Sequence, residues 1–147
     1  MNRSSTEFLL TPQAMGRVDA AAARSGIDSY GLMRRAGEAV AASALRHYPQ
    51  ALRFVVLCGP GNNGGDGYVA AAALARSGAQ VALFSLVDVA LLKGDAARAE
   101  ADCDLPVTPL DRYDPMPGDL VIDGLFGAGL ARDIPDGAKA VVEAVGK

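Results

Sequence analysis

Residues 54–67, FVVLCGPGNNGGDG, decide the fold, because an apolar run passes directly into a glycine-rich loop. The run Phe54–Cys58 shows no polar alternation, which predicts a strand buried on both faces, as in parallel sheets. The loop Gly59–Gly67 contains five glycines, which allow positive φ and the close approach of a ligand. A helix is expected over Tyr68–Ser77, and its free N–H groups would favour a phosphate. The stretch therefore predicts a strand–loop–helix unit that binds a nucleotide-like ligand.

The alternation of strand and helix continues along the chain. Further buried strands are expected at Gln80–Val87 and Leu120–Asp123, a short strand at Leu105–Thr108, and further helices at Leu92–Ala101 and Asp136–Val145. This alternation predicts an α/β fold with a doubly wound, mostly parallel sheet in three α/β/α layers. The crossovers between strands should be right-handed.

Two helices are expected before the first strand, over Thr11–Arg24 and Ser29–Arg46. A threonine and a proline favour the start of the first helix, and a Ser-Gly pair favours its end. The second helix carries an apolar stripe at helical spacing, formed by Met33, Ala36, Val40 and Ala44. This helical pair follows a short tail at residues 1–10. Its apolar face would cover the sheet or join two copies in a homodimer.

The composition fits one domain of a reduced, non-membrane protein. The chain has 147 residues, is 50% hydrophobic and carries a net charge of −3. It lacks the basic patch of nucleic-acid binders, and no apolar run reaches the roughly 18 residues of a membrane-spanning helix. Cys58 and Cys103 lack metal-type spacing and favour reduced thiols in the cytoplasm. His47 is the only histidine, so a histidine metal site or a Ser-His-Asp triad is not expected.

Generic motifs narrow the chemistry of the first loop. It lacks the lysine and hydroxyl residue of a P-loop, which disfavours ATP or GTP hydrolysis of that type. Residues 59–64 match the dinucleotide fingerprint GxGxxG, which also expects an acidic residue after the second strand, where Asp88 stands. Asp66 would face a ribose hydroxyl, a backbone donor or a cation, or it would cap the following helix. Asn62 and Asn63 are either ligand-binding residues or turn residues.

A second group of polar residues follows the last predicted strand. Asp123 ends that strand, and a buried carboxylate there needs a cation, a hydroxyl or the N–H groups of its own loop as partner. Together with Asn63 it would suit a hard cation better than zinc. Arg132 would bind a phosphate and Asp133 would act as an acid or base, or both would form a surface ion pair. Because carboxyl ends of parallel strands share one rim, residues 62–66 and Asp123 are expected to meet in one crevice.

Three stretches resemble a known family. GPGNNGGDG at 59–67, DGLFGAGL at 123–130 and LMRRAG at 32–37 are similar to the YjeF N-terminal domain family of NAD(P)HX epimerases. The resemblance covers residues 11–147 and implies a Rossmann-like fold. It also implies an isomerase of nicotinamide nucleotide repair, which interconverts the R and S forms of hydrated NADH and NADPH, called NADHX and NADPHX.

The resemblance further implies which residues form the site. The substrate-binding residues would be Asn62, Asn63, Gly64, Gly65, Asp66, Gly127, Ala128, Gly129, Leu130, Ala131, Arg132 and Asp133. A potassium ion would be bound by Asn63 and Asp123. Asp133 would carry out the acid–base chemistry. Lys93 is a second candidate for that work, although a solvated lysine at a helix start is the more ordinary interpretation.

The chain departs from the family pattern near its end. Family members continue into an Asp-x-Pro-Ser-Gly segment, which does not occur before Lys147. The domain at residues 11–147 is therefore expected to be incomplete. The implied partner is an ATP- or ADP-dependent dehydratase, fused or separate. Two other functions stay open: a nicotinamide-dependent oxidoreductase, based on GxGxxG, and a non-catalytic nucleotide-binding or scaffold module of the same fold.

Overall fold

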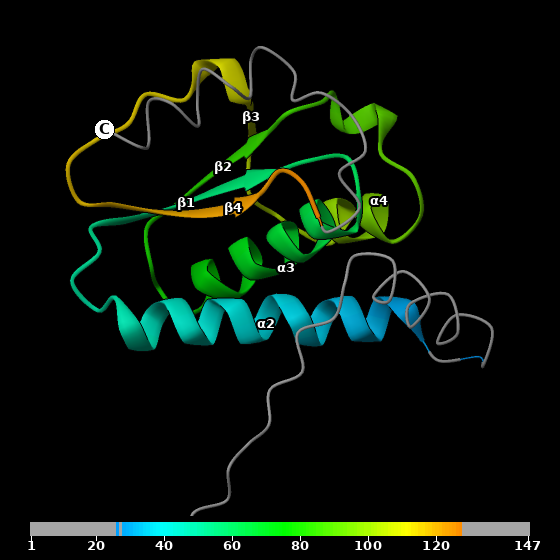
Figure 1. Cartoon of the computed structure of the whole chain (residues 1–147), viewed down its shortest axis with the longest axis horizontal. Helices are drawn as coiled ribbons and strands as arrows, with labels where there is room; N and C mark the ends of the chain where they lie inside the picture. The colour runs from blue at the N-terminus through cyan, green and yellow to red at the C-terminus, as the bar shows by residue number, and fades with distance from the viewer. Residues whose placement is uncertain (1–25, 27, 128–147) are drawn as a thin grey trace, which may run out of the picture.

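The computed structural model describes Gly26 and residues 28–127, in which helices and strands alternate (Figure 1). The elements are α2 (Ser29–His47), β1 (Arg53–Cys58), α3 (Asn62–Arg76), β2 (Val81–Ser85), η1 (Val89–Leu91), α4 (Gly94–Ala101), β3 (Val107–Pro109), η2 (Leu110–Arg112) and β4 (Asp119–Gly124). The two short elements η1 and η2 are 3₁₀ helices. The helices predicted at 11–24 and 136–145 lie outside the described residues.

The four strands form one parallel sheet in the order β3-β2-β1-β4. In the middle of β1, Val56 lies opposite Leu83 of β2 and Ile122 of β4. The chain adds β2 and β3 on one side of β1 and then places β4 on the other side. This reversal creates a topological switch point between β1 and β4, and ligands of such sheets bind beyond the carboxyl ends of the strands there. The predicted α/β fold with a parallel sheet is confirmed.

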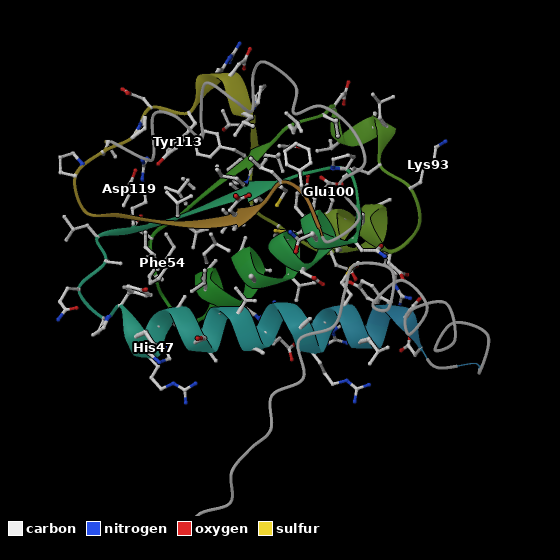
Figure 2. The ribbon with its side chains drawn as sticks, viewed as in Figure 1. His47, Phe54, Lys93, Glu100, Tyr113 and Asp119 are labelled. Carbon is white, nitrogen blue, oxygen red and sulfur yellow. The ribbon has the colours of Figure 1, made fainter. Side chains whose placement is uncertain are left out.

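Helices α2, α3 and α4 all lie on one face of the sheet, with α3 against the strands and α2 outside it (Figure 1). Phe54 points from β1 into the core between sheet and helices (Figure 2). The neighbouring β1 residues face the opposite side, in a cluster formed by Val55, Leu57, Phe84, Leu110 and Leu125. β1 is therefore buried on both faces, as its sequence predicts.

The face that α2 turns to the core differs from the predicted stripe. Its buried residues are Tyr30, Met33, Gly37, Ala41 and Ala44, whereas Ala36 and Val40 are exposed. The reason is a close helix contact: a Cβ atom added at Gly37 would lie 2.5 Å from Cβ of Val69 and 2.7 Å from the carbonyl oxygen of Asp66. At this contact a glycine of α2, and not an apolar side chain such as Val40, therefore faces α3.

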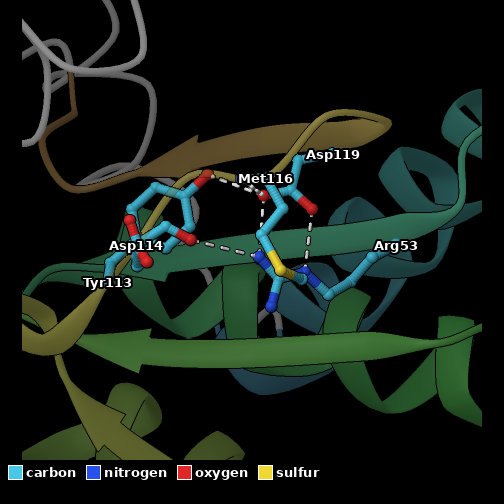
Figure 3. A network of polar contacts seen from close by, with 5 residues as sticks. All are labelled: Arg53, Tyr113, Asp114, Met116 and Asp119. Atoms are coloured by element: carbon cyan, nitrogen blue, oxygen red, sulfur yellow. Dashed lines mark hydrogen bonds and ion pairs between the residues drawn. The ribbon is translucent and has the colours of Figure 1, made fainter.

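A polar network fixes the amino ends of β1 and β4 (Figure 3). Arg53 donates two hydrogen bonds to Asp119, from Nε to Oδ1 at 2.8 Å and from Nη2 to Oδ2 at 2.7 Å. The hydroxyl of Tyr113 and the backbone N–H of Met116 also donate to Oδ2. These hydrogen bonds, led by that from Arg53, hold the pKa of Asp119 below its ordinary value. The network joins the β3–β4 crossover to the sheet at the rim opposite the carboxyl ends.

None of the helices among the described residues has both the length and the apolar composition needed to cross a bilayer.

Candidate active site

The glycine-rich stretch is mostly helix. α3 begins at Asn62, not at the predicted Tyr68, so Gly64, Gly65 and Gly67 lie within its first two turns and are buried. The positive φ angles of the described residues occur only at Gly26, Gly78, Gly94 and Gly118. None of the glycines at positions 59–67 therefore uses the positive φ that glycine allows.

The glycines instead allow backbone segments to touch. A Cβ atom added at Gly59 would overlap the carbonyl oxygen of Leu125, and one added at Gly64 would overlap the carbonyl oxygen of Gly59. The N–H of Gly59 donates to the carbonyl oxygen of Gly124 at 2.9 Å. At Gly61, by contrast, an added Cβ atom would meet nothing within 4 Å. Gly61 is thus the glycine of this loop with space for a ligand.

The start of α3 suits an anion. Gly61 is the N-cap residue and no side chain caps the helix. The first intrahelical bond runs from the N–H of Gly65 to the carbonyl oxygen of Gly61, at 3.1 Å. The N–H groups of residues 62–64 precede it and point toward the loop, where the helix dipole favours negative charge. This end also lies at the switch point of the sheet, where ligands of such sheets bind.

Asn63 joins the two predicted segments. Its Nδ2 donates a hydrogen bond to the carbonyl oxygen of Phe126 at 2.8 Å. A Cβ atom added at Gly127 would lie 3.7 Å from Cβ of Asn63, and one added at Gly124 would lie 3.0 Å from its carbonyl oxygen. The expected meeting of the start of α3 and the segment after β4 at one rim is therefore confirmed, whereas the crevice between residues 62–66 and Asp123 stays a prediction. Asn62 is exposed on the same first turn.

Asp66 does not cap a helix. It lies inside α3, partly buried, because the helix begins four residues before it. The capping alternative is therefore wrong. The first turn of α3 contains no acidic residue.

Asp123 is exposed and not buried, contrary to expectation. Its strand, β4, is one of the two edge strands of the described sheet, which leaves the residue open to solvent. Its Oδ1 accepts a hydrogen bond from the N–H of Leu125 at 3.0 Å. The carboxylate is thus satisfied in part by its own loop, one of the alternatives that the sequence left open.

Asn63 and Asp123 have the chemistry that a hard cation needs. The Asn63 amide nitrogen makes the bond to Phe126, so the amide oxygen is the atom left for a cation. A carboxylate and an amide oxygen are hard ligands. Among the residues that the structure describes, no group of three or more His, Cys, Asp or Glu side chains could hold a metal ion. Amide and carboxylate oxygens of this kind suit a hard cation better than a soft transition metal.

The other candidates lie around this rim or outside the described chain. Lys93 is exposed at the N-cap position of α4 and points away from the domain (Figure 2). Asp88, the candidate for a ribose, accepts a hydrogen bond from the N–H of Ala90 at 3.0 Å and so caps η1. This 3₁₀ turn explains why α4 begins at Gly94 and not at Leu92. Ala128, Gly129, Leu130, Ala131, Arg132 and Asp133 lie outside the described residues.

The sequence did not identify the carbonyl oxygen of Phe126 as a partner of Asn63, because every residue has a backbone carbonyl and the residue type does not show which one accepts a hydrogen bond. It also missed the hydrogen bond between Tyr68 and Ser85. A polar residue at the end of an otherwise apolar strand was the available signal for Ser85.

Comparison with known proteins places this geometry in a family. The family described as YjeF-related protein N-terminus matches residues 29–147. The chain belongs to this family. The matched range includes both loops, Gly59–Gly67 and the segment after β4.

The relatives of this YjeF-related chain are named as NAD(P)H-hydrate epimerases or NAD(P)H-hydrate repair enzymes. An NAD(P)H-hydrate epimerase of Rhodobacter capsulatus is 40% identical over 142 residues, which is 86% of this chain and 65% of the relative. One of Bordetella pertussis is 43% identical over 116 residues, 73% of this chain and 47% of the relative. A bifunctional NAD(P)H-hydrate repair enzyme Nnr of Coxiella burnetii is 39% identical over 116 residues, 77% of this chain and 24% of the relative.

A solved structure agrees with the YjeF-related fold. The crystal structure of yeast ynu0, YNL200c, superposes with a TM-score of 0.75 at 21% identity, covering 95% of this chain and 65% of that one. At this identity the similarity shows the fold. The chain spans between 24% and 65% of the length of the three curated relatives above.

Proposed function

We propose that the protein is an NAD(P)HX epimerase, an isomerase that interconverts the R and S forms of hydrated NADH and NADPH. Relatives at 40% and 43% identity are named NAD(P)H-hydrate epimerase. The observation that carries the proposal is the contact of the two loops at the switch point, where Asn63 binds the carbonyl of Phe126. Both halves of the family motif border one place, which is what a single substrate site requires.

In this proposal the start of α3 binds a phosphate of the dinucleotide. The uncapped N–H groups of residues 62–64 and the open space at Gly61 support this assignment. Asn62–Asp66 would line one side of the substrate, and Gly127–Asp133 would hold the other side. This second range is proposed from the family motif.

The reaction needs proton transfer at the hydrated carbon. That carbon bears a hydroxyl group and the ring nitrogen, so epimerisation breaks and remakes one of these bonds. A positioned acid or base accelerates such a step by roughly 10²–10⁴-fold. Asp133 is the proposed group and Lys93 the second candidate, although the exposed position of Lys93 favours Asp133. Neither a redox partner nor a nucleophile is required.

A potassium ion is proposed at Asn63 and Asp123, whose oxygen atoms suit it. When bound, the ion supplies positive charge beside the phosphate position. Replacement of potassium by a large organic cation should then lower the epimerisation rate at constant ionic strength. An unchanged rate would remove the ion from the proposal.

The partners of the protein are also proposals. The bifunctional relative of Coxiella burnetii supports an ATP- or ADP-dependent dehydratase, fused or separate, that acts on the product.

The exposed side chains of Leu32 and Val40 on α2, with exposed fractions of 42% and 39%, support a homodimer through the N-terminal helices. A monomer mass in sedimentation would contradict the homodimer. A cytoplasmic location fits the two free, buried cysteines, and a fluorescent fusion would test it.

The direct test follows R-to-S conversion of NADHX by the natural protein that carries this chain, with the epimers separated by chromatography. Asp133→Asn should lower the rate by roughly 10²-fold or more. Asp111→Asn, at an exposed position of η2, serves as the control and should leave the rate unchanged. An unchanged rate in Asp133→Asn would exclude this carboxylate from the chemistry. Loss of the near-ultraviolet absorbance of intact NADH with an added substrate would instead indicate an oxidoreductase.

A further inference from the structure

A buried hydrogen-bond chain lies behind the candidate site. The hydroxyl of Tyr68, in the second turn of α3, is fully buried with its ring and donates to Oγ of Ser85 at 3.1 Å. Oγ of Ser85 donates in turn to the carbonyl oxygen of Val87 at 2.7 Å. Ser85 is the last residue of β2 and only 3% exposed. The chain therefore links the start of α3 to the carboxyl end of β2.

The linked strand end is itself fixed to β1. The N–H of Leu86 donates to the carbonyl oxygen of Cys58 at 2.9 Å, immediately before Gly59. The hydroxyl of Tyr68 thus reaches, through Ser85, the same strand ends from which the site loops depart. The candidate site and this hydrogen-bond chain share the carboxyl rim of the sheet.

Two further contacts of this part of α3 are apolar and do not set a direction. A Cβ atom added at Gly65 would lie 2.5 Å from the end of Met33, and one added at Gly67 would lie 2.7 Å from Sγ of Cys58. Such packing holds α3 close to its neighbours but has no angular preference, whereas a hydrogen bond does. Burial, the largest influence, raises the pKa of Tyr68 to about 12, so its hydroxyl keeps its proton at neutral pH.

We infer that Tyr68 and Ser85 are positioning residues of the candidate site, which fix the start of α3 against the segment after β4. The expected effect on the KM for NADHX rests on the proposed function. If the Tyr68 hydroxyl is lost, α3 can shift along its axis, and the N–H groups of residues 62–64 and the bond from Asn63 to Phe126 shift with it. These groups bind substrate in the proposal, so the loss should act on substrate binding and not on proton transfer.

The test compares Tyr68→Phe with Tyr113→Phe in the natural protein. Each variant loses one tyrosine hydroxyl that donates a hydrogen bond, but Tyr113 donates to Asp119 at the opposite rim. Tyr68→Phe should raise KM for NADHX by about fivefold, the equivalent of one hydrogen bond, and change kcat by less than about twofold. Tyr113→Phe should leave both constants unchanged, although it also removes a stabilising bond.

A second measurement does not need epimerase activity. Hydrogen exchange of the ligand-free protein should become faster in residues 59–66 of Tyr68→Phe, and should stay unchanged there in Tyr113→Phe. Ser85→Ala breaks the same bond from the strand side and should reproduce both effects, so the inference stays testable if Tyr68→Phe folds poorly.

Two outcomes would overturn the inference: equal KM values for Tyr68→Phe and Tyr113→Phe, or unchanged exchange in residues 59–66 of both Tyr68→Phe and Ser85→Ala. If the natural protein fails to epimerise NADHX, the proposed function fails, and the exchange comparison alone decides whether Tyr68 and Ser85 position the loop.

Discussion

At the scale of single residues, the candidate site depends on contacts between backbone atoms. Gly59 lies against the carbonyl of Leu125, and Gly64 lies against the carbonyl of Gly59. A side chain at Gly59 would separate the two loops, and one at Gly64 would push the start of α3 away from Gly59. Asn63 then adds one side-chain bond across the same junction. The arrangement of the site therefore requires that these two positions carry no side chain.

The first prediction uses two glycines of one loop. Gly59→Ala should destabilise the protein by about 3 kcal/mol, because backbone atoms must move to admit the new Cβ atom. Gly61→Ala should change stability by less than about 0.5 kcal/mol, because its site is open and its φ of −96° suits alanine. Urea unfolding measures both. Equal effects would show that the loops do not touch at Gly59.

Asp119 gives a prediction about pH. Its folded-state pKa lies below the ordinary value of 3.8, because Arg53 and other donors stabilise the carboxylate. The stabilisation is therefore complete above about pH 4 and is lost as the pH falls through the folded-state pKa. Asp119→Asn should be about 1–3 kcal/mol less stable near neutral pH. The difference from wild type should shrink below about pH 3, as measured by urea unfolding across pH.

A constant difference at every pH would contradict this account, because it would mean that ionisation of Asp119 does not contribute. Asp111→Asn is the matched control. Asp111 is exposed, and among the described residues its side chain takes part in no hydrogen bond or ion pair. The stability of Asp111→Asn should therefore follow that of the wild type at every pH.

The sequence could predict part of the site at this scale. Asn63 and the segment after Asp123 follow two parallel strands, and such strands end at one rim. The sequence could not predict that Asp123 is exposed, because burial at β4 depends on strand order and not on the residues of β4. Nor could it reveal Phe126 as an acceptor, because every residue has a carbonyl group.

At the scale of elements, the strands were predicted well and the start of α3 was not. Phe54–Cys58 is apolar throughout and can be only a buried segment. The first turns of α3 contain three glycines, each of which disfavours a helix by about 1 kcal/mol relative to alanine. Tertiary packing overrides that preference, since Gly65 faces Met33 and Gly67 faces Cys58. The same packing explains why α2 buries Gly37 and leaves Val40 exposed.

The contact between α2 and α3 gives a prediction with an unusual sign. Alanine normally stabilises a helix relative to glycine by about 1 kcal/mol. Gly37→Ala should instead destabilise the protein by about 1–3 kcal/mol, because its Cβ atom would collide with Val69 and the carbonyl of Asp66. Ala36→Ser adds one atom on the exposed side of the same helix and should be nearly neutral. A stabilising Gly37→Ala in thermal unfolding would refute the close contact.

At the scale of the whole molecule, one rim of the sheet carries a stabilising polar network and the other carries the loops of the candidate site. The Arg53–Asp119 network fixes the amino rim, and the loops after β1 and β4 meet at the carboxyl rim beside the switch point. The reversal of strand order brings together two motifs that are far apart in sequence, since Asn63 and Phe126 are 63 positions apart. The alternation of strands and helices in the sequence predicts a doubly wound sheet, but it does not predict which strands are neighbours.

The central claim is that both loops bind one molecule of hydrated NADH or NADPH. The most direct measurement is hydrogen exchange of the natural protein with and without NADHX. We predict slower exchange in residues 59–66 and in residues 123–127 together, with the amino-rim residues 113–119 unchanged. Protection of one loop alone, or protection only at the amino rim, would contradict the claim.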